Sequence, residues 1–527
     1  MADEEPRSVQ SSPISTLHPD VLAEIFGRCD RIYTIYIEDP RPPLHYTLSK
    51  VCTKWRETVQ SSPSLWRKFG INFNDEAMEN AENLEIHARR LDICLRLSGA
   101  LGLELELRYD ASKLESEVPP FLEVAASKLG KHSDRWVSLD IRPTTPAFLS
   151  IIGTKAVKGI PRLSSLNLDF VNIPGPLEAC LPWCDAPKLR AITLIFTTIN
   201  DRVQPHLKHI IPWWQITQLD LKQTTIPYRE LKQLLERTPN LLYLGVRAGE
   251  IEGVTKKITP VRLEYLYSLE FMPPFSFNFN FSSPGSGLPQ IFDILDCPNL
   301  TCLSVWPSPL TMFTGKGSTA RDILDFTYRT KCKLRVLDMG LAQVEDIEIL
   351  IQEIHSLATI IFTTDLREGF LAGLAKALTP TFTLDGMYIP APNLRSIYLN
   401  GKVAGALTGT KLEKHKQELG DLVEALEHRT RGSPSLAVYG IADLRSLTLL
   451  ESRHRIRNCE MPEFDPEVYE PLLKFCRKHR LITKVKVELA GRGEFDRYDG
   501  AGNISGSVQL DGYRIREDTV LFKCFID

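Results

Sequence analysis

The sequence predicts an α/β solenoid, in which a small N-terminal unit of three helices precedes an irregular array of strand–helix repeats. Three observations lead to this prediction: apolar helical segments near the start, a short leucine-rich phrase that recurs along the chain, and helical apolar spacing between its copies. One such repeat cannot bury its apolar face alone. Stacked neighbours are therefore expected to share one continuous core.

The first helix is predicted to begin at Pro19, because proline suits the first position of a helix, where its missing N–H would be unpaired. Leu17 lies just before this start, where it can pack on Leu22 as a hydrophobic staple. Helical spacing then predicts one apolar face, made of Val21, Leu22, Ile25, Phe26 and Cys29.

The same spacing predicts a second helix whose apolar face carries Leu48, Val51, Cys52, Trp55 and Val59. Ser62-Pro63 ends this helix and begins a third one, which carries Leu65, Trp66 and Phe69. A unit of about 50 residues buries only about 60% of its surface, so it cannot hide this many apolar side chains. The surplus predicts a helix-face interface with a partner; the alternative is a helical subdomain packed on the rest of the chain.

These residues also resemble a known family. The order Leu-x-Pro-x-x-Leu-x-x-Ile-Phe, Val-Cys-x-x-Trp and Pro-x-Leu-Trp is similar to the F-box, in the F-box-like variant abundant in fungi. Three submotifs in the right order are more specific than any single motif. The sequence departs from the family at His18, where a second proline is frequent, and in the long connection from Asp30 to Tyr46.

The resemblance implies docking on the Skp-type adaptor of a cullin-RING ubiquitin ligase, and through it on a cullin. The residues that it implies for this contact are Leu17, Pro19, Leu22, Ile25, Phe26, Val51, Cys52, Trp55, Leu65 and Trp66. Some of them must form the core of the unit, and the sequence does not separate the two groups.

A Leu-x-x-Leu-x-Leu phrase recurs after the helical unit. Its first copies lie roughly 25–27 residues apart, within the 20–29 residues of a leucine-rich repeat, and later copies are further apart. Each copy predicts a short strand with alternate side chains inward. The copies are Trp136–Ile141, Leu163–Leu168, Leu189–Leu194, Ile216–Leu221, Leu241–Val246, Leu266–Phe271, Leu300–Val305, Leu334–Met339, Leu357–Phe362, Leu394–Leu399, Leu444–Leu449 and Ile482–Val487.

Other segments complete the predicted array. Within Leu84–Leu97 the pattern predicts a helix followed by a short apolar strand, and Leu103–Leu107 alternates as a strand. Helical spacing predicts helices over Tyr228–Arg237 and Val344–His355. Turns from helix into strand are predicted at the pairs Pro239-Asn240, Pro298-Asn299 and Pro392-Asn393.

Two insertions and the chain end depart from the repeat pattern. Phe275–Gly287 alternates aromatic and polar residues, which favours a strand packed on the solenoid over a contact loop for a ligand. Lys411–Arg429 predicts an amphipathic helix, and this pattern favours an outer-layer helix over a docking helix. The predicted organisation is a disordered tail (1–12), an F-box-like domain (13–72), a linker and first cap (73–132), the degenerate array (133–490) and a C-terminal cap (491–527).

Composition indicates an ordinary globular protein, with 43% hydrophobic and 24% charged residues. A net charge of −3 gives no sign of the basic surface that binds nucleic acid. The basic clusters Arg453–Arg457 and Lys474–Arg480 are predicted to be solvent-exposed faces. No run approaches the ~20 apolar residues of a membrane span, and the start lacks a secretory signal. We therefore expect an intracellular protein, cytoplasmic or nuclear, whose 11 cysteines are thiols.

Motifs of catalysis were sought and are incomplete. The stretch around Gly315-Lys316 lacks the first glycine and the Ser/Thr of a phosphate-binding loop. Cys180 and Cys184 could begin a zinc site, but no second Cys/His pair follows nearby. The sequence therefore predicts no catalytic site, no cofactor and no metal, although an enzyme with an unrecognised site in the C-terminal third stays an alternative.

The predicted function is that of a substrate receptor. The F-box-like unit would dock on the Skp-type adaptor, and the repeats would present an unknown target protein for ubiquitin-dependent degradation. The chain would contribute proximity and no chemistry of its own. The alternative is a leucine-rich-repeat scaffold that binds proteins without forming a ligase.

Overall fold

The structure is a computed structural model of the chain. It describes residues 13–29, 35–37, 44–73, 81–108, 120–142, 146–156, 158–170, 186–196, 211–224, 228–248, 259–272, 287–306, 319–340, 343–365, 369–383, 386–403, 410–427, 429, 444, 446–454, 470–479, 482–490 and 507–509. The chain divides into two compact units, Met1–Val254 and Thr255–Asp527.

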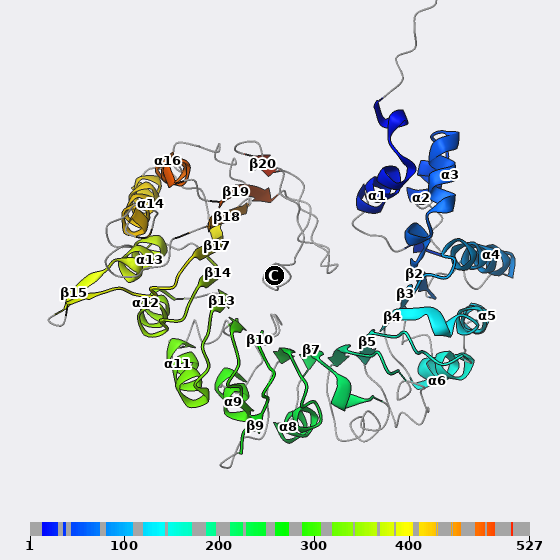
Figure 1. Ribbon diagram of the computed structural model, residues 1–527, viewed down its shortest axis with the longest axis horizontal. Coiled ribbons are helices and arrows are strands. Elements are labelled where there is room, and N and C mark those ends of the chain that lie inside the picture. Colours follow the sequence, from blue (N-terminus) through cyan, green and yellow to red (C-terminus); the bar gives the residue numbers. More distant parts are fainter. Residues whose placement is uncertain are drawn as a thin grey trace, which may run out of the picture. The chain divides into compact units, whose positions relative to one another are not determined.

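The first unit begins with a group of short helices, which we call the helical unit: η1 (Pro13–Thr16), α1 (Pro19–Cys29), α2 (Leu44–Ser49), α3 (Thr53–Ser61) and η2 (Pro63–Trp66). A parallel sheet follows, in which each strand pairs with the next one in the chain (Figure 1). Its strands are β1 (Ile35–Tyr36), β2 (Lys68–Asn72), β3 (Leu103–Arg108), β4 (Trp136–Arg142), β5 (Ser165–Phe170), β6 (Ala191–Phe196), β7 (Gln218–Thr224) and β8 (Tyr243–Ala248).

Helices connect several of these strands and cover one side of the sheet (Figure 1). They are α4 (Ala81–Leu97), α5 (Pro120–Gly130), α6 (Pro146–Lys155) and α8 (Tyr228–Glu236), with single 3-10 turns η5 (Ser133–Arg135) and η7 (Trp213–Gln215). A parallel sheet with helical crossovers is the expected arrangement, because parallel strands cannot be joined by a hairpin.

The second unit repeats this organisation. Its parallel strands are β10 (Ser268–Phe271), β12 (Cys302–Val305), β13 (Val336–Gly340), β14 (Thr359–Asp365), β17 (Ser396–Val403), β18 (Ser446–His454) and β19 (Ile482–Ala490). β20 (Ser507–Gln509) pairs antiparallel with β19. The helices are α9 (Gly287–Ile294), α11 (Thr319–Thr330), α12 (Val344–Glu353), α13 (Phe370–Leu378), α14 (Thr410–Glu427) and α16 (Glu470–His479).

Two small strand pairs stand apart from this sheet in the second unit. β9 (Val261–Arg262) pairs in parallel with β11 (Leu295–Asp296), and β15 (Thr381–Thr383) pairs antiparallel with β16 (Gly386–Tyr388). The fold is therefore mixed α/β with a predominantly parallel sheet.

The recurring leucine phrases are confirmed as strands: every predicted copy overlaps one strand of the parallel sheets. The physical reason is burial on alternate positions, as in β7 and β8, where Leu219, Leu221 and Leu244 are all 0% exposed. The helices predicted over Tyr228–Arg237, Val344–His355 and Lys411–Arg429 are confirmed as α8, α12 and α14. The short strand predicted within Leu84–Leu97 was wrong, because α4 is helical up to Leu97.

The predicted Pro-Asn turns carry a repeated hydrogen bond. The side-chain amides of Asn240, Asn299 and Asn393 donate to the carbonyls of Trp214, Glu264 and His355, at 2.7, 2.8 and 2.9 Å. These partners lie 26, 35 and 38 residues back, in the turn before the preceding strand. Each asparagine therefore ties one turn to its neighbour, which is a reason for this residue type at these positions.

Buried arginines connect neighbouring repeats in a related way. Arg135 donates to the carbonyl of Leu101 at 3.0 Å and to the Ser98 hydroxyl at 2.7 Å. Arg429, which is 1% exposed, donates to the carbonyls of Pro390 and Ala391. Burial lowers the pKa of Arg429 to about 10, so this guanidinium is held inside by backbone carbonyls and still carries its charge at neutral pH.

The second predicted helix was wrong as a continuous element. The chain forms α2 and α3 with a break at Lys50–Cys52, where Cys52 adopts an extended conformation with φ −159° and ψ 171°. The third predicted helix is only the 3-10 turn η2, and Phe69 belongs to strand β2 instead. Pairing of residues 68–72 with β3 satisfies their backbone groups, and this outweighs the helical spacing of the side chains.

Several interpreted segments lie outside the described residues. They are the predicted tail (1–12), the aromatic stretch before Gly287, the stretch at Gly315, the pair Cys180 and Cys184, and most of the predicted C-terminal cap. The predicted domain boundaries stay predictions. In the described part of the chain, no helix combines the length and the apolar character needed to cross a bilayer.

Candidate functional site

The core of the helical unit contains part of the predicted adaptor contact. Leu22, Phe26, Leu65 and Trp66 are 0%, 3%, 6% and 8% exposed. The Phe26 ring lies 4.9 Å from the Trp55 ring, and the indole N–H of Trp66 donates to the Val59 carbonyl at 2.8 Å. Leu22, Phe26, Leu65 and Trp66 thus hold the helices together and offer little surface to a partner.

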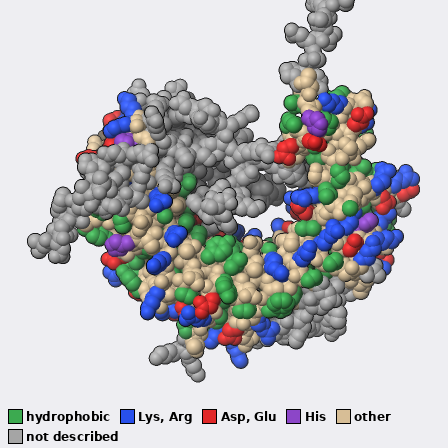
Figure 2. Space-filling model, in the orientation of Figure 1, with side chains coloured by type: hydrophobic (Ala, Val, Ile, Leu, Met, Phe, Trp, Pro, Cys, Tyr) green, Lys and Arg blue, Asp and Glu red, His purple; other side chains and the backbone are tan. Residues whose placement is uncertain are grey.

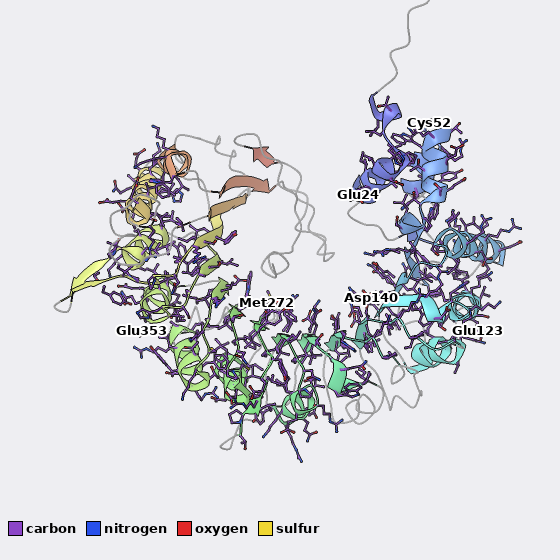
Figure 3. The ribbon with its side chains drawn as sticks, viewed as in Figure 1. Glu24, Cys52, Glu123, Asp140, Met272 and Glu353 are labelled. Carbon is purple, nitrogen blue, oxygen red and sulfur yellow. The ribbon has the colours of Figure 1, made fainter. Side chains whose placement is uncertain are left out.

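The remaining predicted contact residues lie at the surface. Leu17, Ile25 and Trp55 are half-buried, whereas Pro19, Val51 and Cys52 are exposed. Val51 is exposed because it falls in the break between α2 and α3, and Cys52 (labelled in Figure 3) directly precedes α3. Cys52 is thus an exposed free thiol at the surface of the helical unit.

The helical unit also carries exposed apolar side chains on η1, on α1, on α2 and in the turn after α2. Ile14, Val21, Tyr46 and Val51 are 39%, 46%, 48% and 58% exposed, and we call them the exposed apolar set of the helical unit. The Lys50 ammonium lies 4.3 Å from the centre of the Tyr46 ring. Ile14 and Tyr46 were missed by the sequence analysis, because neither belongs to the motifs that carry the resemblance.

A cavity of about 680 Å³ lies where α1 meets η2 and the first strands. Asp20, Glu24 and Gly27 line it from α1, and Ser62 and Pro63 line it from the start of η2. Arg67 and Glu104, which form an ion pair at 2.9 Å, also contribute to its lining. This polar cavity marks the junction between the helical unit and the sheet.

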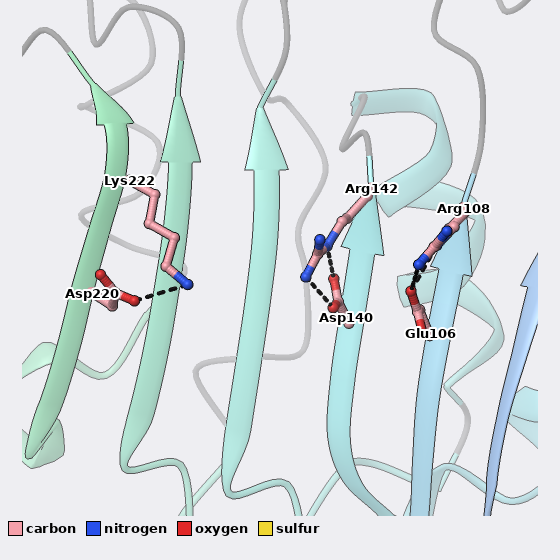
Figure 4. A network of polar contacts seen from close by, with 6 residues as sticks. All are labelled: Glu106, Arg108, Asp140, Arg142, Asp220 and Lys222. Atoms are coloured by element: carbon pink, nitrogen blue, oxygen red, sulfur yellow. Dashed lines mark hydrogen bonds and ion pairs between the residues drawn. The ribbon is translucent and has the colours of Figure 1, made fainter. Parts of the chain in front are cut away.

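The sheet of the first unit carries a regular set of ion pairs on three strands (Figure 4). Arg108 donates to Glu106 at 2.7 Å on β3, and Arg142 donates to Asp140 at 2.8 Å on β4. On β7, Lys222 lies 3.0 Å from Asp220. Each pair joins residues two positions apart, so both side chains project from the face opposite the buried leucines.

Register brings these pairs into rows. Glu106 lies opposite Asp140, and Arg108 lies opposite Arg142. The hydrogen bond to Asp140 raises the pKa of Arg142, whereas burial raises the pKa of the nearby Asp169 carboxyl. On this face, acidic and basic side chains of the same strand neutralise each other's charge. Such a polar face suits recognition of a polar partner surface better than burial in a core.

The second unit has a more buried polar row, made of Glu270, Ser304 and Asp338 on neighbouring strands. The Ser304 hydroxyl donates to Asp338 at 2.9 Å, and Ser304 and Glu270 are 2% and 8% exposed. Burial and the charge of Glu270 together raise the pKa of Asp338 to about 6, against the opposing effect of the hydrogen bond from Ser304.

Asp338→Asn is expected to stabilise the second unit at pH 7. A folded pKa of about 6 lies above the ordinary aspartate value of 3.8, so wild-type stability falls as pH rises from about 4 to 6 and then levels off. Asparagine keeps an acceptor for Ser304 and removes this loss, which corresponds to at most about 3 kcal/mol. Urea denaturation should show the variant more stable at pH 7 and equal to wild type near pH 4. If the variant and the wild type had equal unfolding free energies at both pH values, the raised pKa of the Asp338 carboxyl would be contradicted.

The cysteine thiols of the core are not poised for chemistry. Burial raises the pKa of Cys94 and of Cys302 to about 12, so neither forms a thiolate near neutral pH. Across the described ranges, no group of three or more His, Cys, Asp or Glu side chains is placed to hold a metal ion.

No protein-family model matches the chain, and a search of curated proteins finds no significant relative. The resemblance to the F-box therefore depends on the residues of the helical unit themselves. The exposed apolar set of this unit and the polar faces and edges of the sheets are the surfaces from which a function can be argued.

Proposed function

We propose that the chain is the substrate-recognition (F-box) subunit of an SCF-type cullin-RING ubiquitin ligase. In this proposal the helical unit docks on a Skp-type adaptor, and the parallel sheets with their helices form a leucine-rich-repeat solenoid that presents a target protein. The chain brings the target close to the charged conjugating enzyme and carries out no bond-making step itself.

One observation is the main support for the proposed adaptor contact. The helical unit has four large apolar side chains that are 39% to 58% exposed, although its core is already filled by Leu22, Phe26, Leu65 and Trp66. A fully buried valine contributes about 1.5 kcal/mol or more relative to an exposed one. Covering Val21, Val51, Tyr46 and Ile14 by a partner helix would therefore supply a substantial part of the binding free energy.

The motif order supports the same proposal, but the structure changes which residues should be tested. Substitution of Leu22 or Phe26 would disturb the core, so loss of binding in such variants would not identify a docking surface. Val21 and Val51 are the informative positions, because they are exposed and lie on α1 and in the turn after α2.

The double variant Val21→Asp/Val51→Asp should lose adaptor binding. Two carboxylates placed in a covered apolar contact would weaken binding by about a hundredfold, which is 2.7 kcal/mol. The test is co-expression of the full chain with a Skp-type adaptor, followed by affinity purification and titration calorimetry. The matched control is Val124→Asp on α5, where the valine is 38% exposed outside the helical unit.

The proposal requires that wild type and the Val124 variant bind alike and that the double variant does not, with unchanged circular dichroism in all three. Absence of wild-type binding, or equal binding by the double variant, would overturn it. Adaptor binding without recruitment of a cullin would instead support the protein-binding scaffold that forms no ligase.

A further inference from the structure

The turns before the strands of the first unit stack into a continuous edge. The backbone N–H of Arg190 donates to the Ser164 carbonyl at 3.0 Å, that of Thr217 to Arg190 at 2.9 Å, and that of Leu242 to Thr217 at 2.8 Å. Because parallel strands all begin at the same side of a sheet, residues that precede successive strands lie next to one another there.

This edge carries an excess of exposed basic side chains. We call them the basic edge: Arg96 before β3, Lys131 before β4, Lys158 and Arg162 before β5, and Lys188 and Arg190 before β6. Within the described turns before β3 to β6, Asp134 is the acidic residue, 3.7 Å from Lys158. Figure 2 shows Lys and Arg side chains in a nearly continuous run over this part of the unit.

Neighbouring ionisable groups respond to this charge. Burial lowers the pKa of His132, and the charges of Arg135 and Lys158 lower it further. Burial also lowers the pKa of Arg135, an effect that Asp134 opposes and Arg162 reinforces. Lys158 and Arg162 are therefore close enough to act on His132 and Arg135, and this concentration of positive charge favours an anionic group beside it.

The next two turns continue the edge with apolar side chains. Trp214, in η7, is 66% exposed, and Leu242, just before β8, is 36% exposed. The backbone at Trp214 is held in place, because its carbonyl accepts the hydrogen bond from the Asn240 amide at 2.7 Å. A rigidly mounted, exposed tryptophan beside a charged surface is the residue type that dominates protein–protein contacts.

We propose that the basic edge binds an acidic polypeptide segment of a partner protein, and that an apolar side chain next to the acidic residues packs on Trp214. The six turns from β3 to β8 cover about 24 Å at ~4.8 Å per strand, which matches an extended segment of about eight residues. This inference rests on the proposed function in one respect, which is the identification of the partner with the target protein that the chain presents. Binding of the acidic segment to the basic edge does not require the adaptor.

A polypeptide fits this surface better than a long polyanion. The whole chain has a net charge of −3, so a nucleic acid or an anionic membrane that extends beyond the edge meets no further excess of positive charge. A short acidic segment experiences mainly the charges within about 8–10 Å, which here are the lysines and arginines of the edge.

The experiment measures binding of fluorescein-labelled peptides to the full-length chain by fluorescence anisotropy. The probes are a peptide of eight glutamates and the same peptide with Leu-Phe added at either end. Comparators are an eight-lysine peptide, a ten-nucleotide oligothymidylate and vesicles containing phosphatidylserine. The variants are Arg162→Glu/Lys188→Glu on the edge and a matched control, Arg89→Glu/Lys376→Glu, whose side chains are both 73% exposed elsewhere.

The glutamate peptides should bind wild type and the control variant alike, more weakly as salt rises, and the edge variant at least about tenfold more weakly. Trp214→Ala should weaken a Leu-Phe peptide severalfold and leave the plain glutamate peptide unchanged. The proposal is overturned if the edge and control variants bind the acidic peptides equally, if no acidic peptide binds, or if the oligonucleotide or the vesicles bind more tightly. Because no adaptor is present, these outcomes are independent of the adaptor-binding experiment above.

Discussion

Leu22→Asp is expected to unfold the helical unit. Leu22 is 0% exposed on α1, so aspartate would remove a buried leucine side chain and place a carboxylate in the core. The two effects together should cost about 4 kcal/mol or more of unfolding free energy. Hydrogen exchange of the backbone amides of α1 and α3 should accelerate strongly, and adaptor binding should be lost because the unit is no longer folded.

The matched control for this substitution is the preceding residue. Val21 is 46% exposed, and an aspartate there lies in the first turn of α1, where a negative charge is favourable. Val21→Asp should therefore change the unfolding free energy by less than about 1 kcal/mol. Equal loss of amide protection in the two variants would show that Val21 belongs to the core, and would remove the basis for the proposed docking surface.

Gly130→Ala is expected to destabilise the first unit by about 2–3 kcal/mol. Gly130 ends α5, and a Cβ atom there would lie 1.9 Å from the carbonyl oxygen of Lys155 and 2.6 Å from its carbonyl carbon. Because these are backbone atoms at the end of α6, no side-chain rotation relieves the contact, and the two helices must separate. Urea denaturation of the full chain should show an earlier first transition.

Gly27→Ala is the control for this prediction. Gly27 lies in α1, and no atom is within 4 Å of its added Cβ, so alanine should raise helix stability by about 0.5–1 kcal/mol. If Gly130→Ala did not lower the unfolding free energy more than Gly27→Ala does, the close packing of α5 against the end of α6 would be contradicted.

The strands were predictable because their signal is local. A leucine at every second position has only one favourable arrangement, burial on the inner side of a sheet, as Leu219 and Leu221 show. The Pro-Asn pairs likewise located the turns. The sequence did not reveal that Asn240 bonds to Trp214, since this contact depends on the stacking of two repeats.

The candidate surfaces were less predictable because they depend on what covers each face. Helical spacing placed Val21 and Leu22 on one predicted face, yet the structure buries Leu22 and exposes Val21. In the pair Trp213-Trp214, only the first indole is buried, at 5% exposure against 66%. Val51 became available only because the predicted helix breaks beside it.

The basic edge is the surface that was least predictable from the sequence. The basic runs that stand out in the sequence are Arg453–Arg457 and Lys474–Arg480, where charges are adjacent in the chain. The residues of the edge, such as Lys131, Arg162 and Lys188, lie about one repeat apart in sequence, so no local window contains them. Parallel stacking of the strands brings them together, and only a structure displays the result.

The measurement that tests the central proposal most directly is hydrogen–deuterium exchange of the full-length chain with and without a Skp-type adaptor. The proposal predicts slower exchange on adaptor addition in η1, α1, α2 and the turn at Lys50–Cys52, with the sheets of both units unchanged. No adaptor-dependent protection, or protection confined to the sheets, would contradict a docking role for the helical unit.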